Sequence, residues 1–142
     1  MYFEEIELGT VIDVEPTIID EQEMLDFALR YDNIPLHTDQ EYCKNTRFGR
    51  IIAPGVMAFM AVWANYLKAD ISKEQLVAGK TTKIEWHKPV YANDILKSQA
   101  VVTRKMEGKH TGTVELTFSI TNQNADLVMT NVTEMVVKKK ST

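Results

Sequence analysis

One segment limits the fold of this chain more than any other: residues 51–64 are almost uninterrupted apolar side chains. Pro54 favours a helix start and would disrupt a helix interior, so a helix is predicted from Gly55 to about Leu67. A helix that is apolar on almost every face is expected to be buried on all sides. The segment is shorter than the roughly 20 residues that span a membrane. In a chain of 142 residues, it predicts one central helix wrapped by the rest of the fold.

The second half of the chain supplies strands that could wrap this helix. Residues 83–87 are strand-like, and residues 96–104 and 128–137 are rich in β-branched side chains. Between residues 113 and 121 the sequence alternates with a period of two, which places on one face Val114, Leu116, Phe118 and Ile120. Short turns join the last three strands, which predicts an antiparallel meander with one face on a core. Helices before strands is the α+β order, so we predict a curved antiparallel sheet around a buried helix.

The N-terminal part predicts a short strand and then a helix. The strand would cover Thr10–Glu15. Asp20, with Glu23 three positions later, has the spacing of a capping box and predicts the start of the helix. The apolar face of this helix, at helical spacing, would consist of Met24, Leu25, Ala28 and Leu29.

A loop and a second short helix are predicted next. Residues 32–36 are predicted as a loop because the helical pattern breaks there and Pro35 follows. Thr38 with Glu41 is a second cap signal, which predicts a short helix through Cys43.

Composition narrows the function classes. The net charge is −4, which does not favour a nucleic-acid binder. The single cysteine, Cys43, allows no intrachain disulfide, so a reducing cytoplasm is the expected location. The acidic N-terminus is unlike a signal peptide, and no segment suits a membrane. We expect one domain over residues 1–142.

Several chemically active side chains are predicted to be structural or solvated. The three histidines, 37, 87 and 110, are scattered and no cysteine cluster accompanies them, so no metal site is predicted. Cys43 has no base beside it in sequence and is not predicted to be a nucleophile. On a strand, Trp86 and His87 must point to opposite faces, and we expect a packed tryptophan and an exposed histidine. His110 should be solvated in a hairpin turn.

Asp32 and His37 are the candidates for chemistry. A carboxylate can take a proton from water, and a histidine titrates near neutral pH and can give or take one. Two such groups converging on one water could add it to a substrate or remove it. The spacing alone leaves a plain alternative open, in which Asp32 is a turn-former and His37 a surface residue.

The start of the central helix is a second candidate. A helix N-terminus presents free N–H groups and a positive dipole end. Gly55 has no side chain, so a ligand carbonyl could approach its N–H closely, whereas Pro54 has no N–H to donate. The plain alternative is that Pro54 and Gly55 only start a helix.

These segments together resemble the MaoC dehydratase family, which includes (R)-specific enoyl-CoA hydratases. The resemblance rests on an Asp, a His five positions later and an acidic residue two positions after that, here Asp32, His37 and Asp39. A Phe-Gly pair and an Ile-Ala-x-Gly segment follow, at residues 48–49 and 52–55. Residues 86–94 are similar to the family's Phe-x-x-Pro-Val-x-x-Gly-Asp turn. The resemblance covers about residues 5 to 138.

The resemblance implies a hot-dog fold, in which a strongly bent antiparallel sheet wraps a long helix. It also implies a homodimer with an acyl thioester, such as a coenzyme A thioester, between the subunits as substrate, and no other cofactor. Asp32 and His37 would be the catalytic pair and the Gly55 N–H the oxyanion donor. Substrate contacts would come from Phe48, Pro54, Val56 and Met57.

Three positions depart from the family pattern. Arg30-Tyr31 stands where many members have Ser-Gly, Pro54 where His is common, and Asn93 where the turn has Gly. The implied activity is hydration of a 2-enoyl thioester to a 3-hydroxyacyl thioester. The alternatives are a hot-dog acyl-CoA thioesterase and a non-catalytic subunit that binds acyl thioesters.

Overall fold

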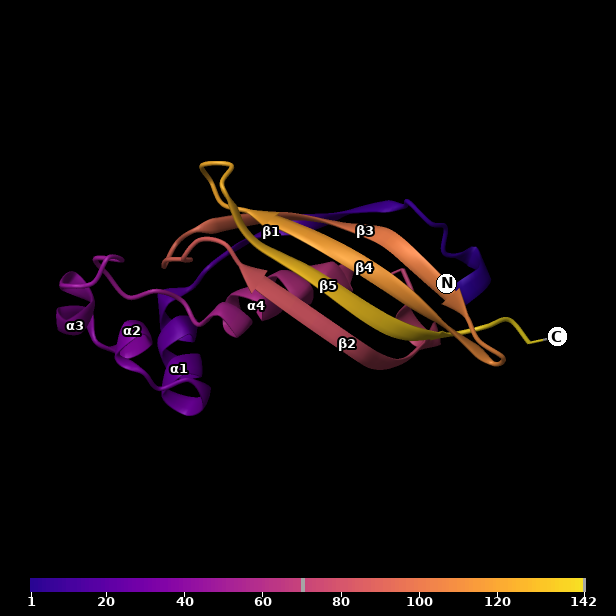
Figure 1. Ribbon diagram of the computed structural model, residues 1–142, viewed down its shortest axis with the longest axis horizontal. Coiled ribbons are helices and arrows are strands. Elements are labelled where there is room, and N and C mark those ends of the chain that lie inside the picture. The colour runs from indigo at the N-terminus through magenta and orange to yellow at the C-terminus, as the bar shows by residue number, and fades with distance from the viewer. Residues whose placement is uncertain (70, 142) are drawn as a thin grey trace.

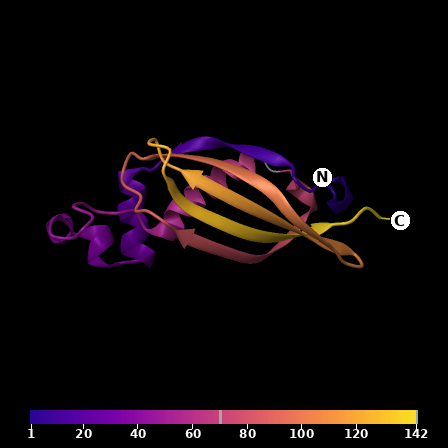
Figure 2. The ribbon, with the colours of Figure 1, turned by 45° about the horizontal axis from the view of Figure 1, so that its top comes forward.

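A single antiparallel sheet curves over one long helix (Figures 1 and 2). The computed structural model describes residues 1–69 and 71–141, and within them five strands pair in the order β1-β3-β4-β5-β2. The strands are β1 (Val11–Ile18), β2 (Leu76–Trp86), β3 (Ile95–Glu107), β4 (Thr111–Thr121) and β5 (Leu127–Lys138). The long helix is α4 (Gly55–Lys68). This confirms the predicted α+β class and the hot-dog fold that the resemblance implies.

The remaining helices are short and fall into two groups. Three of them gather beyond one end of the strands, opposite the end where both chain termini lie (Figure 1): α1 (Glu21–Tyr31), α2 (Pro35–Thr38) and α3 (Gln40–Lys44). Two short 3-10 helices are η1 (Phe3–Glu5) and η2 (Lys73–Gln75). The α1–α3 group is therefore placed to build a site at one end of the sheet.

Strand β4 shows why the sheet has a buried face. It pairs with β3 on one side and β5 on the other, so it is a central strand. Its alternation predicts one buried face, and the four apolar side chains of that face are all fully buried: Val114, Leu116, Phe118 and Ile120. The period-two prediction is confirmed.

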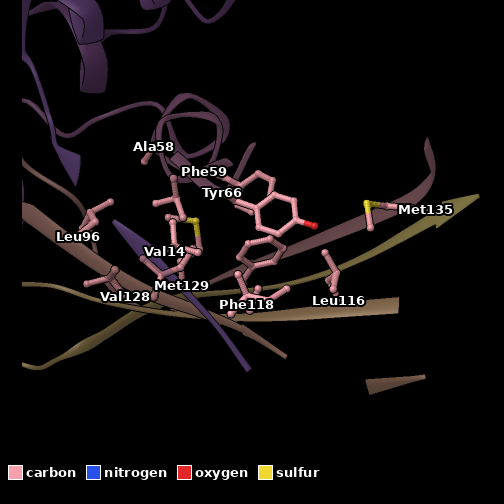
Figure 3. Close-up of a cluster of buried hydrophobic side chains, with 14 of the residues drawn as sticks. Val14, Ala58, Phe59, Tyr66, Leu96, Leu116, Phe118, Val128, Met129 and Met135 are labelled. Carbon is pink, nitrogen blue, oxygen red and sulfur yellow. The ribbon is translucent and has the colours of Figure 1, made fainter. Parts of the chain in front are cut away.

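An aromatic cluster joins the buried face to α4 (Figure 3). The ring of Phe118 meets the rings of Phe59 and Tyr66 edge to face, with centroid distances of 5.7 and 5.4 Å. Trp63 lies 5.9 Å from Phe118 and 4.9 Å from Tyr66. Such tilted and T-shaped contacts are favourable for aromatic rings. They hold the helix at one position over the sheet.

Helix α4 is not covered on all sides, and that prediction is wrong for the single chain. Ala58, Val62 and Tyr66 are fully buried, but Val56, Met60 and Leu67 are each close to half exposed. The last three are spaced by four and seven residues, so they form one stripe along the helix. The sheet covers one side of α4 and leaves this apolar stripe uncovered.

Local predictions before α4 are partly wrong. Asp20 caps α1 as expected, since its side chain accepts a hydrogen bond from the Glu23 N–H at 3.0 Å. Leu29, however, is exposed, because α1 buries a narrower face on Met24 and Ala28. The predicted loop at 32–36 is shorter than expected, because Pro35 takes the first position of α2.

The cap of α3 is also one residue later than predicted. The Asp39 side chain accepts from the Tyr42 N–H at 3.1 Å, and Asp39 is the N-cap. The Thr38 hydroxyl instead donates back to the Ile34 carbonyl at 3.1 Å, because Thr38 belongs to the last turn of α2.

Candidate active site

A pocket of about 390 Å³ lies between the ends of several elements. Its lining comes from the end of α1, from α2, from the start of α4 and from the segment where β2 ends and the turn toward β3 begins. It brings together five of the seven predicted site residues: Asp32, His37, Phe48, Gly55 and Val56. The other two lie elsewhere. Pro54 is buried as the residue before α4, and Met57 is buried beside a separate pocket with Phe27 and Tyr31.

Asp32 and His37 face each other at this pocket. His37 Nε2 lies 3.3 Å from Asp32 Oδ2. His37 Nδ1 lies 2.7 Å from the Ile52 carbonyl oxygen. A carbonyl only accepts hydrogen bonds, so Nδ1 must carry the proton of this bond and Nε2 is the nitrogen that faces Asp32. The His37 side chain is only 9% exposed and that of Asp32 is 43% exposed, so the carboxylate is the member that meets water.

The chain between the two residues sets this geometry. Asp32 ends α1, with its N–H bonded to the Ala28 carbonyl at 3.0 Å. The Ile34 N–H then bonds back to the Asp32 carbonyl at 2.9 Å, and Pro35 starts α2. Since α2 is one turn long, His37 falls in that turn and points back at Asp32. The proline in the motif therefore places the imidazole.

The backbone of Ile52 fixes the imidazole from the other side. Its N–H donates to the Leu36 carbonyl at 3.1 Å, while its carbonyl accepts from His37 Nδ1. The next residue, Ala53, donates its N–H to the Val90 carbonyl at 2.7 Å. Segment 52–53 thus connects α2 to the turn after β2, and it makes all three contacts with its own main-chain atoms.

Gly55 begins α4 beside this pair. The first N–H groups of α4 have no intrahelical acceptor, as at any helix start, and Pro54 provides no side-chain cap for them. A Cβ on Gly55 would lie 2.3 Å from Cε2 and Nε1 of the Trp86 indole. The absent side chain is therefore explained by the ring of Trp86, which fills that space and lines the pocket.

The expectation that Trp86 packs inward is wrong. Trp86 is 53% exposed and lies at the pocket instead of in the core. His87 is exposed, as predicted, and its Nε2 is 3.1 Å from the Thr130 hydroxyl. Trp86 is the last residue of β2, where the strand leaves the sheet, so the alternation of faces no longer decides burial there.

Gly55→Ala is expected to lower kcat/KM by about 10²-fold, because the new methyl group must displace the Trp86 ring or the helix start. The measurement is the turnover of a 2-enoyl thioester, the substrate that the family resemblance implies, with urea unfolding as a fold control. In a Trp86→Ala background the same substitution should cost much less, because the space is then open. An equal loss in both backgrounds would show that the indole is not the reason for the glycine.

The turn at residues 91–94 directly follows Pro89 and Val90, which line the pocket. Asn93 has φ +69°, the left-handed conformation that the family's turn glycine would supply. Asp94 is buried, accepts from the Tyr91 N–H at 2.9 Å and from Gln123 Nε2 at 3.0 Å, and has a structural role. Asn93 therefore adopts the turn conformation at a position where the family pattern has glycine.

Cys43 is a buried structural thiol. Its Sγ lies 3.4 and 3.5 Å from the carbonyl oxygens of Leu36 and Pro35, to which it donates weak hydrogen bonds. Burial raises the pKa of the Cys43 thiol, and the Asp39 carboxylate adds to the rise. A raised pKa keeps the thiol protonated and a poor nucleophile.

Native protein is therefore expected to react with Ellman's reagent at pH 8 at least about tenfold more slowly than unfolded protein, because the thiolate is the reactive form. In urea, one thiol per chain should react rapidly. Fast reaction of the native protein would contradict the burial of Cys43.

Some residues of the pocket were not identified from the sequence. Arg47, Trp86, His87 and Lys88 line it beside the predicted ones. A cluster of basic side chains from two distant segments was a possible signal, but nothing in the sequence placed residues 47 and 87–88 together.

In the described part of the chain, no group of three or more His, Cys, Asp or Glu side chains could hold a metal ion. None of the helices in that part is both long enough and apolar enough to cross a lipid bilayer.

Comparison with solved structures shows close likeness in fold. A protein from Archaeoglobus fulgidus described as a monoamine oxidase regulatory protein matches with a TM-score of 0.92 and 28% identity, over 99% of this chain and 96% of that one. R-hydratase PhaJ1 from Pseudomonas aeruginosa matches with a TM-score of 0.79 and 21% identity, over 98% of this chain and 86% of that one. The (R)-hydratase from A. caviae involved in PHA biosynthesis matches with a TM-score of 0.75 and 24% identity, over 96% and 99% of the two chains.

A family model gives the assignment. The model described as the MaoC like domain matches residues 5–124, which is most of the chain. The Asp32–His37 pair, the start of α4 and the turn after β2 all lie within that match. The chain belongs to the MaoC-like domain family.

Proposed function

We propose that this protein is a hydratase that adds water to a 2-enoyl thioester and gives a 3-hydroxyacyl thioester. The observation that carries the proposal is the Asp32–His37 pair, 3.3 Å apart, beside the uncapped start of α4. Its support from relatives is the family itself and the two neighbours named as R-hydratases.

In this mechanism, the thioester carbonyl oxygen lies against the Gly55 N–H. Asp32 and His37 hold one water beside the β-carbon. Asp32, ionised, takes a proton from that water as its oxygen bonds to the β-carbon. The electron pair of the double bond moves toward the carbonyl, giving an enolate-like state that the Gly55 N–H and the helix dipole stabilise. One such donor is typically worth about 3 kcal/mol in the transition state.

The second half of the reaction uses His37. Its Nδ1 stays bonded to the Ile52 carbonyl, so Nε2 is the nitrogen that exchanges protons. His37 Nε2–H delivers a proton to the α-carbon, and the proton on Asp32 then returns to Nε2 across their 3.3 Å contact. Both groups act from one side of the substrate, so addition is syn. The family resemblance implies the (R)-3-hydroxyacyl product.

Incubation with crotonyl-CoA tests the activity directly. Loss of the enone absorbance without release of free thiol means hydration. Release of free thiol means that Asp32 activates water against the thioester carbonyl, as in a thioesterase. Binding without either change means a non-catalytic acyl-thioester subunit. A panel of enoyl-CoA substrates with different chain lengths and branches would then identify the preferred acyl group.

We also infer that the active form is a homodimer. The apolar stripe of Val56, Met60 and Leu67 lies uncovered on α4. Among the described strands, β2 is an edge strand: β5 pairs with one side of it and its other side is unpaired. Pairing with a second copy would cover both features. Sedimentation at micromolar concentration should give twice the chain mass of 16.2 kDa. A monomer at that concentration would contradict the inference.

A further inference from the structure

Tyr91 connects two segments at the pocket, although it does not line the pocket itself. Its side chain is half-buried, and its hydroxyl donates a hydrogen bond to the Phe48 carbonyl oxygen at 3.1 Å. Phe48 and the residue before it, Arg47, both line the pocket. The bond therefore joins the turn after β2 to a segment that forms part of the pocket surface.

Both the main chain and the ring of Tyr91 are fixed. Its N–H donates to the buried carboxylate of Asp94 at 2.9 Å, and Asp94 also accepts from Gln123 Nε2 at 3.0 Å. The guanidinium carbon of Arg50 lies 4.0 Å from the centroid of the Tyr91 ring, within the range of a cation–π contact. The hydroxyl therefore reaches Phe48 from a position that other contacts have already set.

The turn that carries Phe48 has local hydrogen bonds of its own. The Thr46 hydroxyl donates to the Cys43 carbonyl at 2.8 Å and accepts from the Phe48 N–H at 3.3 Å. The Gly49 N–H donates to the Thr46 carbonyl at 3.1 Å, and Gly49 has φ +73°. These bonds shape the turn. The bond from Tyr91, 43 positions further along the chain, ties the turn to the segment between β2 and β3.

We propose that Tyr91 is a positioning residue that holds the Phe48 ring in place at the pocket and so sets how tightly the pocket binds its ligand. This inference rests on the proposed function, because a thioester is the ligand that Phe48 would contact. Tyr91 does not line the pocket, so it acts on ligand affinity and leaves the chemistry to Asp32 and His37.

Tyr91→Phe tests the role of the hydroxyl, because it keeps the ring that Arg50 contacts. With crotonyl-CoA as substrate, KM should rise about fivefold, the effect of losing one ordinary hydrogen bond, and kcat should stay within about twofold of wild type. Tyr42→Phe is the matched control. It removes the same hydroxyl from an exposed residue of α3 that does not line the pocket, and both constants should stay at their wild-type values.

A Phe48→Ala background separates positioning of the ring from general loosening of the turn. Alanine keeps the carbonyl that accepts the bond but removes the ring, so adding Tyr91→Phe should change KM by less than about twofold. Trypsin should cut after the exposed Arg47 and Arg50 about fivefold faster without the hydroxyl in either background. Equal rises in KM in both backgrounds, unchanged cleavage, or a fall in kcat at constant KM would overturn the inference.

Butyryl-CoA has no double bond to hydrate, so its binding, measured by calorimetry, gives a readout without turnover. Tyr91→Phe should bind it about fivefold more weakly than wild type, with no further loss when Phe48→Ala is already present. If this pattern is found but crotonyl-CoA is not hydrated, the inference holds and the proposed hydratase function fails. If crotonyl-CoA is hydrated but the pattern is absent, the function holds and the inference fails.

Discussion

Replacing Asp32 with asparagine is expected to lower kcat for hydration by about 10²–10⁴-fold while the protein stays folded. Asparagine has nearly the same shape as aspartate but cannot accept a proton from water. The Asp32 side chain is 43% exposed, so water can hydrate the asparagine amide that replaces it. Steady-state rates on the true thioester, with circular dichroism as a fold control, measure the effect. Near-full activity of this variant would show that Asp32 is not the base.

Two replacements of His37 separate its catalytic role from its structural one. His37→Asn can place an amide N–H near the position of Nδ1 and keep the bond to the Ile52 carbonyl, yet it has no group in place of Nε2. His37→Gln reaches toward the Nε2 position and loses the Ile52 bond. Both should lower kcat by about 10²–10⁴-fold. The asparagine variant should be the more stable of the two in urea.

The double variant Asp32→Asn/His37→Gln completes the test. Because both groups act on one water, it should be little slower than the slower single variant. If the two losses multiplied instead, the groups would act independently. That outcome would contradict the shared-water mechanism while leaving each residue important.

The fold was predictable from the sequence where the pattern is long. The period-two alternation of β4 and the apolar run of α4 each extend over ten or more residues, so local exceptions do not change the result. Short signals were less reliable. Thr38 and Asp39 are both good caps, and the start of α2 at Pro35 decides between them by taking Thr38 into its last turn.

The exposure of α4 shows a different limit. An apolar helix must be covered, but its sequence does not say whether the cover is its own sheet or a second chain. Val56, Met60 and Leu67 are apolar like Val62, yet only Val62 is buried by the chain itself. The sequence therefore predicts that the apolar faces of α4 are buried, and the tertiary structure shows which of those faces the chain itself covers.

The sequence predicted the acid and the imidazole of the site, but not the contacts that position them. Asp32 and His37 were identified because an acid and an imidazole have recognisable chemistry. The Ile52 carbonyl, which sets the proton position on His37, is a main-chain atom, and any residue at position 52 would supply it. The contact between Trp86 and Gly55 joins residues 31 positions apart, so no local sequence pattern predicts it.

Phe118→Ala is expected to lower the free energy of unfolding by about 3–5 kcal/mol, the range for truncating a buried phenylalanine. Phe118 is fully buried, and its ring contacts three aromatic rings of α4, of which Figure 3 labels Phe59 and Tyr66. Urea unfolding would measure the change from the shift in midpoint at constant slope. Phe27→Ala, in the half-buried ring that meets Tyr31 at 5.2 Å, is the control and should cost clearly less.

A double-mutant cycle shows whether the loss comes from the aromatic contact or only from lost volume. Phe59 meets Phe118 edge to face at 88°, so the pair should be coupled by about 0.5–1.5 kcal/mol beyond area burial. The variants are Phe118→Leu, Phe59→Leu and their combination, because leucine keeps most of the apolar volume and removes the ring. Additive losses would mean that the core holds α4 by volume alone. Coupled losses would mean that ring geometry fixes the helix over the sheet, and with it the position of the Gly55 N–H at the start of that helix.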